Sequence, residues 1–195
     1  RVAGANGGLV TIPFTASALD AVNTNLVLIG GLNSSKASVS RSTNGGGSWS
    51  TTDISAYATS VVGIVMFDAS NGVVIGNPVS GKFGIGKTTT GGSAWAQATG
   101  SPIANQNESI VSGSICSWGD AVWFGTTSGR VIYSVNKGQS WSQGSLGITG
   151  AQIVSIAFRD STNGVLLYRA SSANDAPYQT AYSVNGGLNW KSVAT

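Results

Sequence analysis

The chain has 195 residues, of which 41% are hydrophobic and only 9% charged, so it can bury a core while carrying much less charge than most soluble domains. Its 28 glycines suit short strands joined by tight turns better than long solvated helices. The net charge of +3 comes from ten basic and seven acidic residues that form no basic cluster. This excludes nucleic-acid binding, which depends on clustered Lys and Arg.

The scarcity of histidine and cysteine excludes several kinds of catalytic and metal-binding site. The chain has no His and a single cysteine, Cys116. The first absence excludes Ser-His-Asp triads, Cys-His dyads and most transition-metal sites, and the second excludes an internal disulfide and a Cys-based zinc site. No apolar run reaches the ~20 residues of a membrane-spanning helix. We therefore expect no metal, no cofactor and no membrane span.

Short runs that alternate apolar and polar residues, separated by turn residues, predict strands throughout the chain. In the first half we expect strands at 9–14, 25–30, 37–42, 48–51, 61–67, 73–76, 82–88 and 94–98. In the second half we expect strands at 110–116, 121–125, 130–134, 140–143, 153–158, 165–168, 179–183 and 189–193. No segment has helical periodicity, so the sequence predicts an all-β protein.

A short segment recurs four times without gaps, each time after the third strand of a repeat. It ends in a tryptophan, and the intervals between Trp49, Trp95, Trp141 and Trp190 are 46, 46 and 49 residues. Its other defining residues are Ser42, Asn44, Gly46, Thr88, Thr90, Gly92, Ser134, Asn136, Gly138, Ser183, Asn185 and Gly187. Ser, Thr and Asn side chains can accept hydrogen bonds from nearby amides, glycine accepts a positive φ, and a buried indole anchors the next strand. We therefore interpret the segment as a structural hairpin.

A repeat of this length with four strands is typical of a β-propeller blade. The recurring segment resembles the Asp-box, or BNR, repeat of sialidases, sortilin-type receptors, xyloglucanases and YCF48-like assembly factors, with Asn or Thr where the box usually has Asp. The resemblance implies that the boxes are structural and not catalytic. It also implies one β-propeller segment of four-stranded antiparallel blades over 1–195, with blades at approximately 1–52, 53–98, 99–144 and 145–195. Because Asp-box propellers usually have six or more blades, we expect these four to belong to a larger propeller, with a self-closed ring of four as the alternative.

The acidic and basic residues do not form the pattern of a propeller glycoside hydrolase. A sialidase has an Arg before Ile-Pro in its signature, and no Arg precedes Ile12-Pro13. A xyloglucanase-type hydrolase needs two carboxylates across a cleft, whereas the loop acids Asp53 and Glu108 have no spacing that pairs them. The sequence thus leans towards a non-catalytic module that binds or scaffolds. The alternatives are a fragment of a propeller glycoside hydrolase and a YCF48-like assembly factor.

Ligand binding is expected on the loops at the face opposite the box hairpins. The candidate ligand-facing residues are Asp53, Tyr57, Lys82, Glu108, Arg130, Arg169, Asp175 and Tyr178. The longest loop, 169–178, is the best candidate for recognition. Trp118 and Trp123 are expected to pack in the third blade, with a sugar-stacking platform as a second interpretation. The expected partners are a protein or glycan ligand and the remaining blades of the same propeller or another copy; the low charge predicts an extracellular or cell-surface location, in a bacterium.

Overall fold

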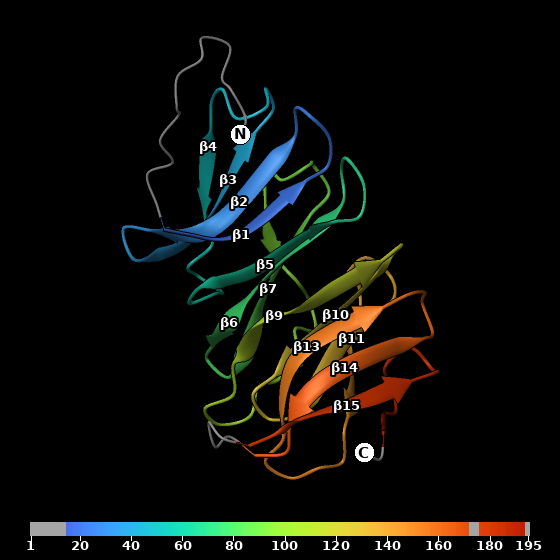
Figure 1. The fold of residues 1–195 in the computed structure, drawn as a ribbon. Coiled ribbons are helices and arrows are strands. Elements are labelled where there is room, and N and C mark those ends of the chain that lie inside the picture. The colour runs from blue at the N-terminus through green and yellow to red at the C-terminus, as the bar shows by residue number, and fades with distance from the viewer. Residues whose placement is uncertain (1–14, 172–175, 194–195) are drawn as a thin grey trace. The chain divides into compact units, whose positions relative to one another are not determined.

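The structure is a computed structural model that describes residues 15–171 and 176–193. Within these ranges the chain forms sixteen strands and no helix (Figure 1). The strands make four sheets, and each sheet contains four antiparallel strands in chain order. Among the described residues, no helix is long and apolar enough to cross a membrane.

The strands have the following bounds. The first sheet contains β1 (Thr15–Ala21), β2 (Val27–Asn33), β3 (Lys36–Ser42) and β4 (Ser50–Asp53). The second contains β5 (Val61–Met66), β6 (Gly72–Val79), β7 (Lys82–Thr88) and β8 (Ala96–Gln97). The third contains β9 (Ile110–Trp118), β10 (Ala121–Thr126), β11 (Arg130–Ser134) and β12 (Ser142–Ser145). The fourth contains β13 (Gln152–Phe158), β14 (Gly164–Arg169), β15 (Tyr178–Ser183) and β16 (Lys191–Ser192).

The first strand of the first sheet is not among the strands that the sequence predicted. The first strand of the first sheet is Thr15–Ala21, whereas the sequence predicted 9–14, a segment outside the described residues. The segment 15–21 contains small residues and one aspartate and has no clear apolar alternation, so its own pattern does not predict a strand. It becomes a strand because it pairs with β2 through a bulge between Ala16 and Ala18.

The recurring segment forms the same turn between the third and fourth strands of every sheet. In the first sheet, Ser42 Oγ accepts hydrogen bonds from the N–H groups of Gly46 (2.8 Å) and Asn44 (3.3 Å). Asn44 Oδ1 then accepts from the N–H of Ser48 (2.8 Å), and Trp49 Nε1 donates to the carbonyl of Gly46 (3.1 Å). The backbone at Gly46 has a φ of 91°, a conformation that favours glycine. Local side-chain hydrogen bonds therefore define this turn.

The other three turns repeat this geometry with small changes. The hydroxyls of Thr88, Ser134 and Ser183 accept from the N–H groups of Gly92, Gly138 and Gly187 at 2.9, 2.9 and 3.0 Å. In the second turn Thr90 Oγ1 takes the place of the Asn oxygen and accepts from the N–H of Ala94 (3.1 Å). Of the four tryptophans in these turns, Trp190 is buried and the other three are half-buried.

Replacing Ser134 with alanine tests the contribution of one turn. The buried Ser134 hydroxyl accepts from the N–H of Gly138 and donates to Asn136 Oδ1 (3.0 Å). Without it, the buried N–H of Gly138 loses its acceptor, so the free energy of unfolding should fall by about 1–3 kcal/mol in urea titrations. Ser140→Ala, which removes an exposed hydroxyl of the same turn, is the control and should cost less than about 0.5 kcal/mol. Equal effects of the two substitutions would contradict a structural role for the buried hydroxyl.

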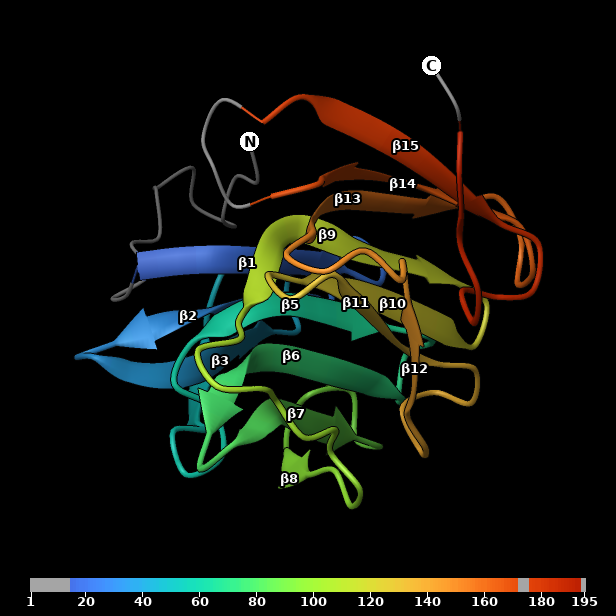
Figure 2. The ribbon, with the colours of Figure 1, turned by 90° about the horizontal axis from the view of Figure 1, so that it is seen from below.

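The chain divides into two compact units, Arg1–Ala98 and Thr99–Thr195. Each unit contains two sheets that pack through their first strands, β1 against β5 in one unit and β9 against β13 in the other (Figure 2). Each unit has its own apolar core between its two sheets.

In the first unit, the repeated turn of the second sheet packs against the first sheet. Arg41 Nε of β3 donates to the carbonyl of Gly91 (2.6 Å). A Cβ added at Gly92 would lie 2.3 Å from Leu28 Cδ2, and one added at Gly30 would lie 2.4 Å from Val61 Cγ1. The close approach of the two sheets therefore depends on glycine at both positions.

The second unit uses the same arrangement with a larger side chain. Trp123 of β10 is fully buried, stacks on Phe158 with ring centroids 3.8 Å apart, and donates from Nε1 to the carbonyl of Gly186 (2.8 Å). A Cβ added at Gly125 would lie 2.3 Å from Ile153 Cγ2. In both units, a side chain of the earlier sheet thus contacts the turn glycines of the later sheet.

Candidate binding site

The candidate site lies at the loop end of the third and fourth sheets, which is the end where the second strand of a sheet connects to the third. In the fourth sheet, Arg169 ends β14 and pairs with Tyr178, the first residue of β15. The guanidinium carbon of Arg169 lies 4.6 Å from the centre of the Tyr178 ring, and Nη2 donates to the Tyr178 hydroxyl. Tyr178 remains 54% exposed. The Arg169 guanidinium thus holds the exposed Tyr178 ring in place through a cation–π contact and a hydrogen bond.

A buried ion pair shapes the neighbouring loop of the third sheet. Arg130, the first residue of β11, donates from Nε to Glu108 Oε1 (2.9 Å) and from Nη2 to Glu108 Oε2. Nη2 also donates to the carbonyl of Ile103 (2.8 Å), and Nη1 donates to Gln143 Oε1 (2.6 Å). The N–H of Asn105 donates to Glu108 Oε2 (2.7 Å). These bonds hold the loop 99–109 against β11.

The ion pair keeps Glu108 ionised. Burial alone would raise the pKa of this carboxyl, but the hydrogen bonds from Arg130 and from the N–H of Asn105 outweigh burial, so the net pKa is lowered. Both carboxylate oxygens are occupied by donors. A carboxylate held in this way suits a structural role, because it has no proton to donate at neutral pH.

The anchored loop exposes one large apolar side chain. The side chain of Ile103 is 70% exposed, although its backbone carbonyl accepts a hydrogen bond from Arg130. Sequence reasoning did not select Ile103, because a single apolar residue in a loop carries no pattern. The loop ends of the third and fourth sheets thus offer Ile103, Tyr178 and Arg169 as accessible contacts.

The remaining candidate residues fall in different surroundings. Asp53 is exposed, pairs with Lys36 (3.0 Å), and has its pKa lowered to about 2 by hydrogen bonds from Ser55 and Lys36. Tyr57 is buried, and burial raises its pKa to about 12. Lys82 is exposed at the start of β7. Asp175 lies outside the described residues. Of the eight candidates, Tyr57 and Glu108 are therefore buried and not presented to solvent.

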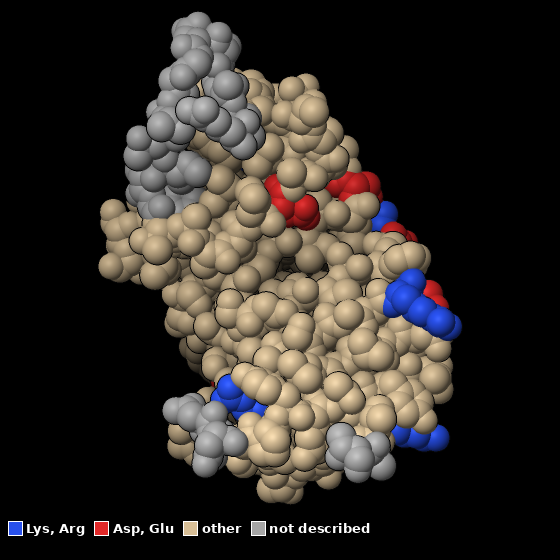
Figure 3. All heavy atoms as spheres, viewed as in Figure 1, with Lys and Arg blue, Asp and Glu red and all other residues tan. Residues whose placement is uncertain are grey.

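All described carboxylates have structural partners. The remaining ones are Asp20, which accepts from the N–H of Met66, Asp68 and Asp160, which accept from amides of their own turns, and Asp120, which pairs with Lys137. The described residues contain no group of three or more His, Cys, Asp or Glu that could hold a metal ion. The face viewed in Figure 3 carries few charged side chains.

The two tryptophans outside the repeated turns differ in burial. Trp123 packs between the third and fourth sheets, as described above. Trp118, by contrast, is 52% exposed at the end of β9, so the expectation that it packs in the third blade was wrong. Its position next to the tight Gly119-Asp120 turn, where the chain leaves the sheet, accounts for the exposure.

The chain is similar to known proteins in structure but not in sequence. No family model matches the chain, and no curated protein matches it. YCF48 from Cyanidioschyzon merolae is similar over 95% of this chain and 61% of its own, with a TM-score of 0.59 and 16% identity. The GH74 enzyme of Niastella koreensis is similar over 91% of this chain and 38% of its own, with a TM-score of 0.55 and 12% identity.

A third similar structure is a mutant of the NanB sialidase from Streptococcus pneumoniae. It covers 75% of this chain and 26% of the sialidase, with a TM-score of 0.51 and 17% identity. Together with four antiparallel four-stranded sheets, these similarities decide the fold class. The four sheets are β-propeller blades. The chain spans about three fifths of the YCF48 structure and less than two fifths of the GH74 structure.

Proposed function

We propose that the chain is a non-catalytic binding module with Asp-box blades and that it binds a protein ligand at the loop end of the third and fourth blades. The observation that carries this proposal is the exposed Arg169–Tyr178 pair. Arg and Tyr are among the residue types that contribute most to protein–protein interfaces, and the cores of such interfaces are apolar. Ile103 adds an exposed apolar side chain on the neighbouring blade.

The surroundings of the acidic residues support a binding role over hydrolysis. A glycoside hydrolase of the two-carboxylate type needs one carboxyl group with a raised pKa and a second one across the cleft. The pKa values of Asp53 and Glu108 are instead lowered, and both carboxylates are engaged by cations. We extend the proposal to a secreted or cell-surface location because the composition is poor in charge and rich in glycine.

Tyr178→Ala tests the binding site. We expect the labelled chain to bind selected sequences on an overlapping-peptide array, and the substitution should weaken that binding at least tenfold because it removes the exposed ring. Trp118→Ala, which removes an aromatic side chain of similar exposure at the opposite end of a blade, should leave binding unchanged.

A glycan array and a hydrolysis assay on xyloglucan and sialyl substrates separate the alternatives. Binding confined to glycans and lost in Tyr178→Ala would keep the site but replace the ligand class. Turnover of either substrate would refute the non-catalytic proposal.

A further inference from the structure

The cations of the second unit differ in whether a carboxylate pairs with them. Three form ion pairs, namely Arg130 with Glu108, Lys137 with Asp120 and Arg159 with Asp160. Arg169 forms none with any residue that the structure describes. Lys191 also lacks one, but it pairs in register with Tyr182 beside the repeated turn, at the opposite end of the blade. Arg169 is thus the described cation of this unit that lacks a counterion at the loop end.

The guanidinium of Arg169 leaves most of its hydrogen-bond donors unused. Within residues 15–171 and 176–193 its one acceptor is the hydroxyl of Tyr178, which is bonded to Nη2. Nε is buried and has no acceptor. Buried donors without an acceptor are rare in folded proteins, and a guanidinium pairs best with a carboxylate, through two parallel bonds. The described part of the chain offers it no carboxylate, because each of those carboxylates already has another partner.

The Tyr178 side chain adds a donor and an aromatic surface beside this cation. Its hydroxyl oxygen accepts from Arg169, so the hydroxyl hydrogen remains available to a ligand. The guanidinium carbon lies 4.6 Å from the ring centre, and more than half of the tyrosine is exposed. The pair therefore offers donors to an anion and an apolar ring to the group that carries the anion.

A single guanidinium fits a carboxylate better than a phosphate group. Phosphate sites usually combine several cations or a row of backbone N–H groups, because a phosphate group carries more charge and more acceptor oxygens. Arg130, the other described arginine at this end, is held by Glu108 and by the carbonyl of Ile103. One unpaired positive charge therefore matches the single charge of a carboxylate.

We propose that Arg169 and Tyr178 bind the carboxylate of an Asp or Glu side chain in the protein ligand, so that the site selects acidic peptides. This inference rests on the proposed function, because it names the chemistry of the ligand at the same site. A side chain is the source because the donors here are themselves side chains, whereas C-terminal carboxylates are bound by successive backbone N–H groups. Arg169 contacts the anion, and the Tyr178 ring packs against the rest of the acidic residue.

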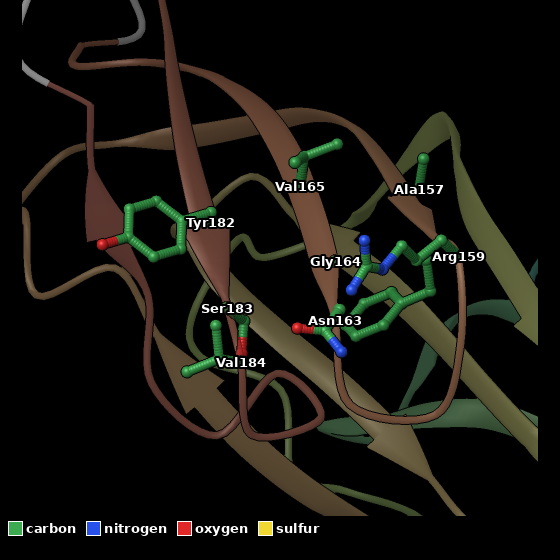
Figure 4. A pocket seen from close by; sticks show the side chains of 9 residues that line it. Ala157, Arg159, Asn163, Gly164, Val165, Tyr182, Ser183 and Val184 are labelled. Atoms are coloured by element: carbon green, nitrogen blue, oxygen red, sulfur yellow. The ribbon is translucent and has the colours of Figure 1, made fainter.

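The fourth blade supplies a matched control arginine. Arg159 lines an apolar pocket of about 500 Å³ near the repeated turn, together with Val165 and Tyr182 (Figure 4). Its Nε already donates to Asp160 (3.2 Å), so a carboxylate of the chain itself pairs with this cation. Arg159→Met removes the same charge from the same blade as Arg169→Met does. It should leave peptide selection unchanged, and it controls for the lower net charge.

Three peptide libraries with the same random, neutral flanks test the selection. The first has Glu at its centre and blocked ends, the second has Gln in place of Glu, and the third has a neutral centre and a free C-terminal carboxylate. The labelled chain should bind the first library about tenfold more tightly than the second, because only Glu forms a charge-assisted pair with Arg169. Arg169→Met should remove this difference, and Arg169→Lys, which keeps the charge but loses the planar donors, should restore only part of it. Circular dichroism checks that each variant keeps its strands.

The outcomes separate this inference from the proposed function. A preference for Glu that is lost in Arg169→Met and kept in Arg159→Met supports the inference. Equal binding of the first two libraries, with loss of binding in Tyr178→Ala, overturns the carboxylate contact but leaves the binding site in place. A preference for Glu that persists in Arg169→Met, or binding confined to the third library, also overturns the inference. A chain that binds none of the libraries refutes the proposed function and this inference together.

Discussion

Trp123→Ala should lower the free energy of unfolding by about 3–5 kcal/mol, the effect expected for removal of a fully buried aromatic side chain. The substitution removes the stack on Phe158 and leaves a cavity between the third and fourth blades. It also leaves the carbonyl of Gly186 without its donor. The loss can be measured by urea titration followed by circular dichroism.

Two controls separate the contributions at this position. Trp118→Ala removes an exposed indole and should change the free energy of unfolding by less than about 0.5 kcal/mol. Trp123→Phe keeps an aromatic ring against Phe158 but lacks the N–H donor, so its effect should be intermediate. If Trp123→Ala were as mild as Trp118→Ala, the packing of the two blades would not depend on this side chain.

Arg130→Ala should destabilise the chain by about 3–5 kcal/mol at neutral pH, because it leaves the buried Glu108 carboxylate without its cation. The loop 99–109 should loosen as well, since Arg130 also holds the carbonyl of Ile103. Urea titration gives the change in stability, and hydrogen exchange of the loop amides gives the local effect.

The pH dependence of this variant has a defined sign. In the unmodified chain the folded pKa of Glu108 lies below the unfolded value of 4.5, so its stabilisation is present above pH 4.5 and is lost as the pH falls through the folded pKa. Without Arg130, burial still raises the pKa of Glu108 while fewer hydrogen bonds lower it, so its folded pKa should lie above that of the unmodified chain and the variant should lose less stability on acidification. The gap between the two proteins should therefore shrink on acidification.

Two further variants test whether the effect of Arg130→Ala comes from the unpaired charge of Glu108. Lys36→Ala removes the exposed ion pair with Asp53 and should leave the free energy of unfolding nearly unchanged, because solvent screens this pair. The double variant Arg130→Met with Glu108→Leu removes both charges and should recover much of the loss. A constant gap between Arg130→Ala and the unmodified chain from neutral to acidic pH would show that Glu108 is not the group left unpaired.

The repeated turns explain why much of the fold could be predicted. Ser42, Asn44 and Gly46 define their turn through local hydrogen bonds, and such bonds depend on sequence spacing alone. Each third strand ends on the Ser or Thr of the turn, and each fourth strand begins directly after the Trp. The strand β1 had no such local signal, because its residues become a strand only by pairing with β2.

The candidate site was less predictable because burial depends on distant contacts. Glu108 and Tyr57 occupy loops between blades, where sequence reasoning expects exposure. The partner of Glu108 is 22 residues away, and no local pattern links it to Arg130. Arg169 and Tyr178 could be selected because the loop between them is long, but only the strand register brings the two side chains together.

The direction of the contacts between blades has a consequence for synthesis. In both units, the surface that receives a turn belongs to the earlier blade, as with Leu28 and Trp123, and the turn that fills it, with Gly92 or Gly187, comes later in the chain. A ribosome that makes the chain from its N-terminus therefore completes both of these receiving surfaces before it makes the turns that cover them. The second blade and the fourth blade can each be added to a blade that already exists, without waiting for residues still to be translated.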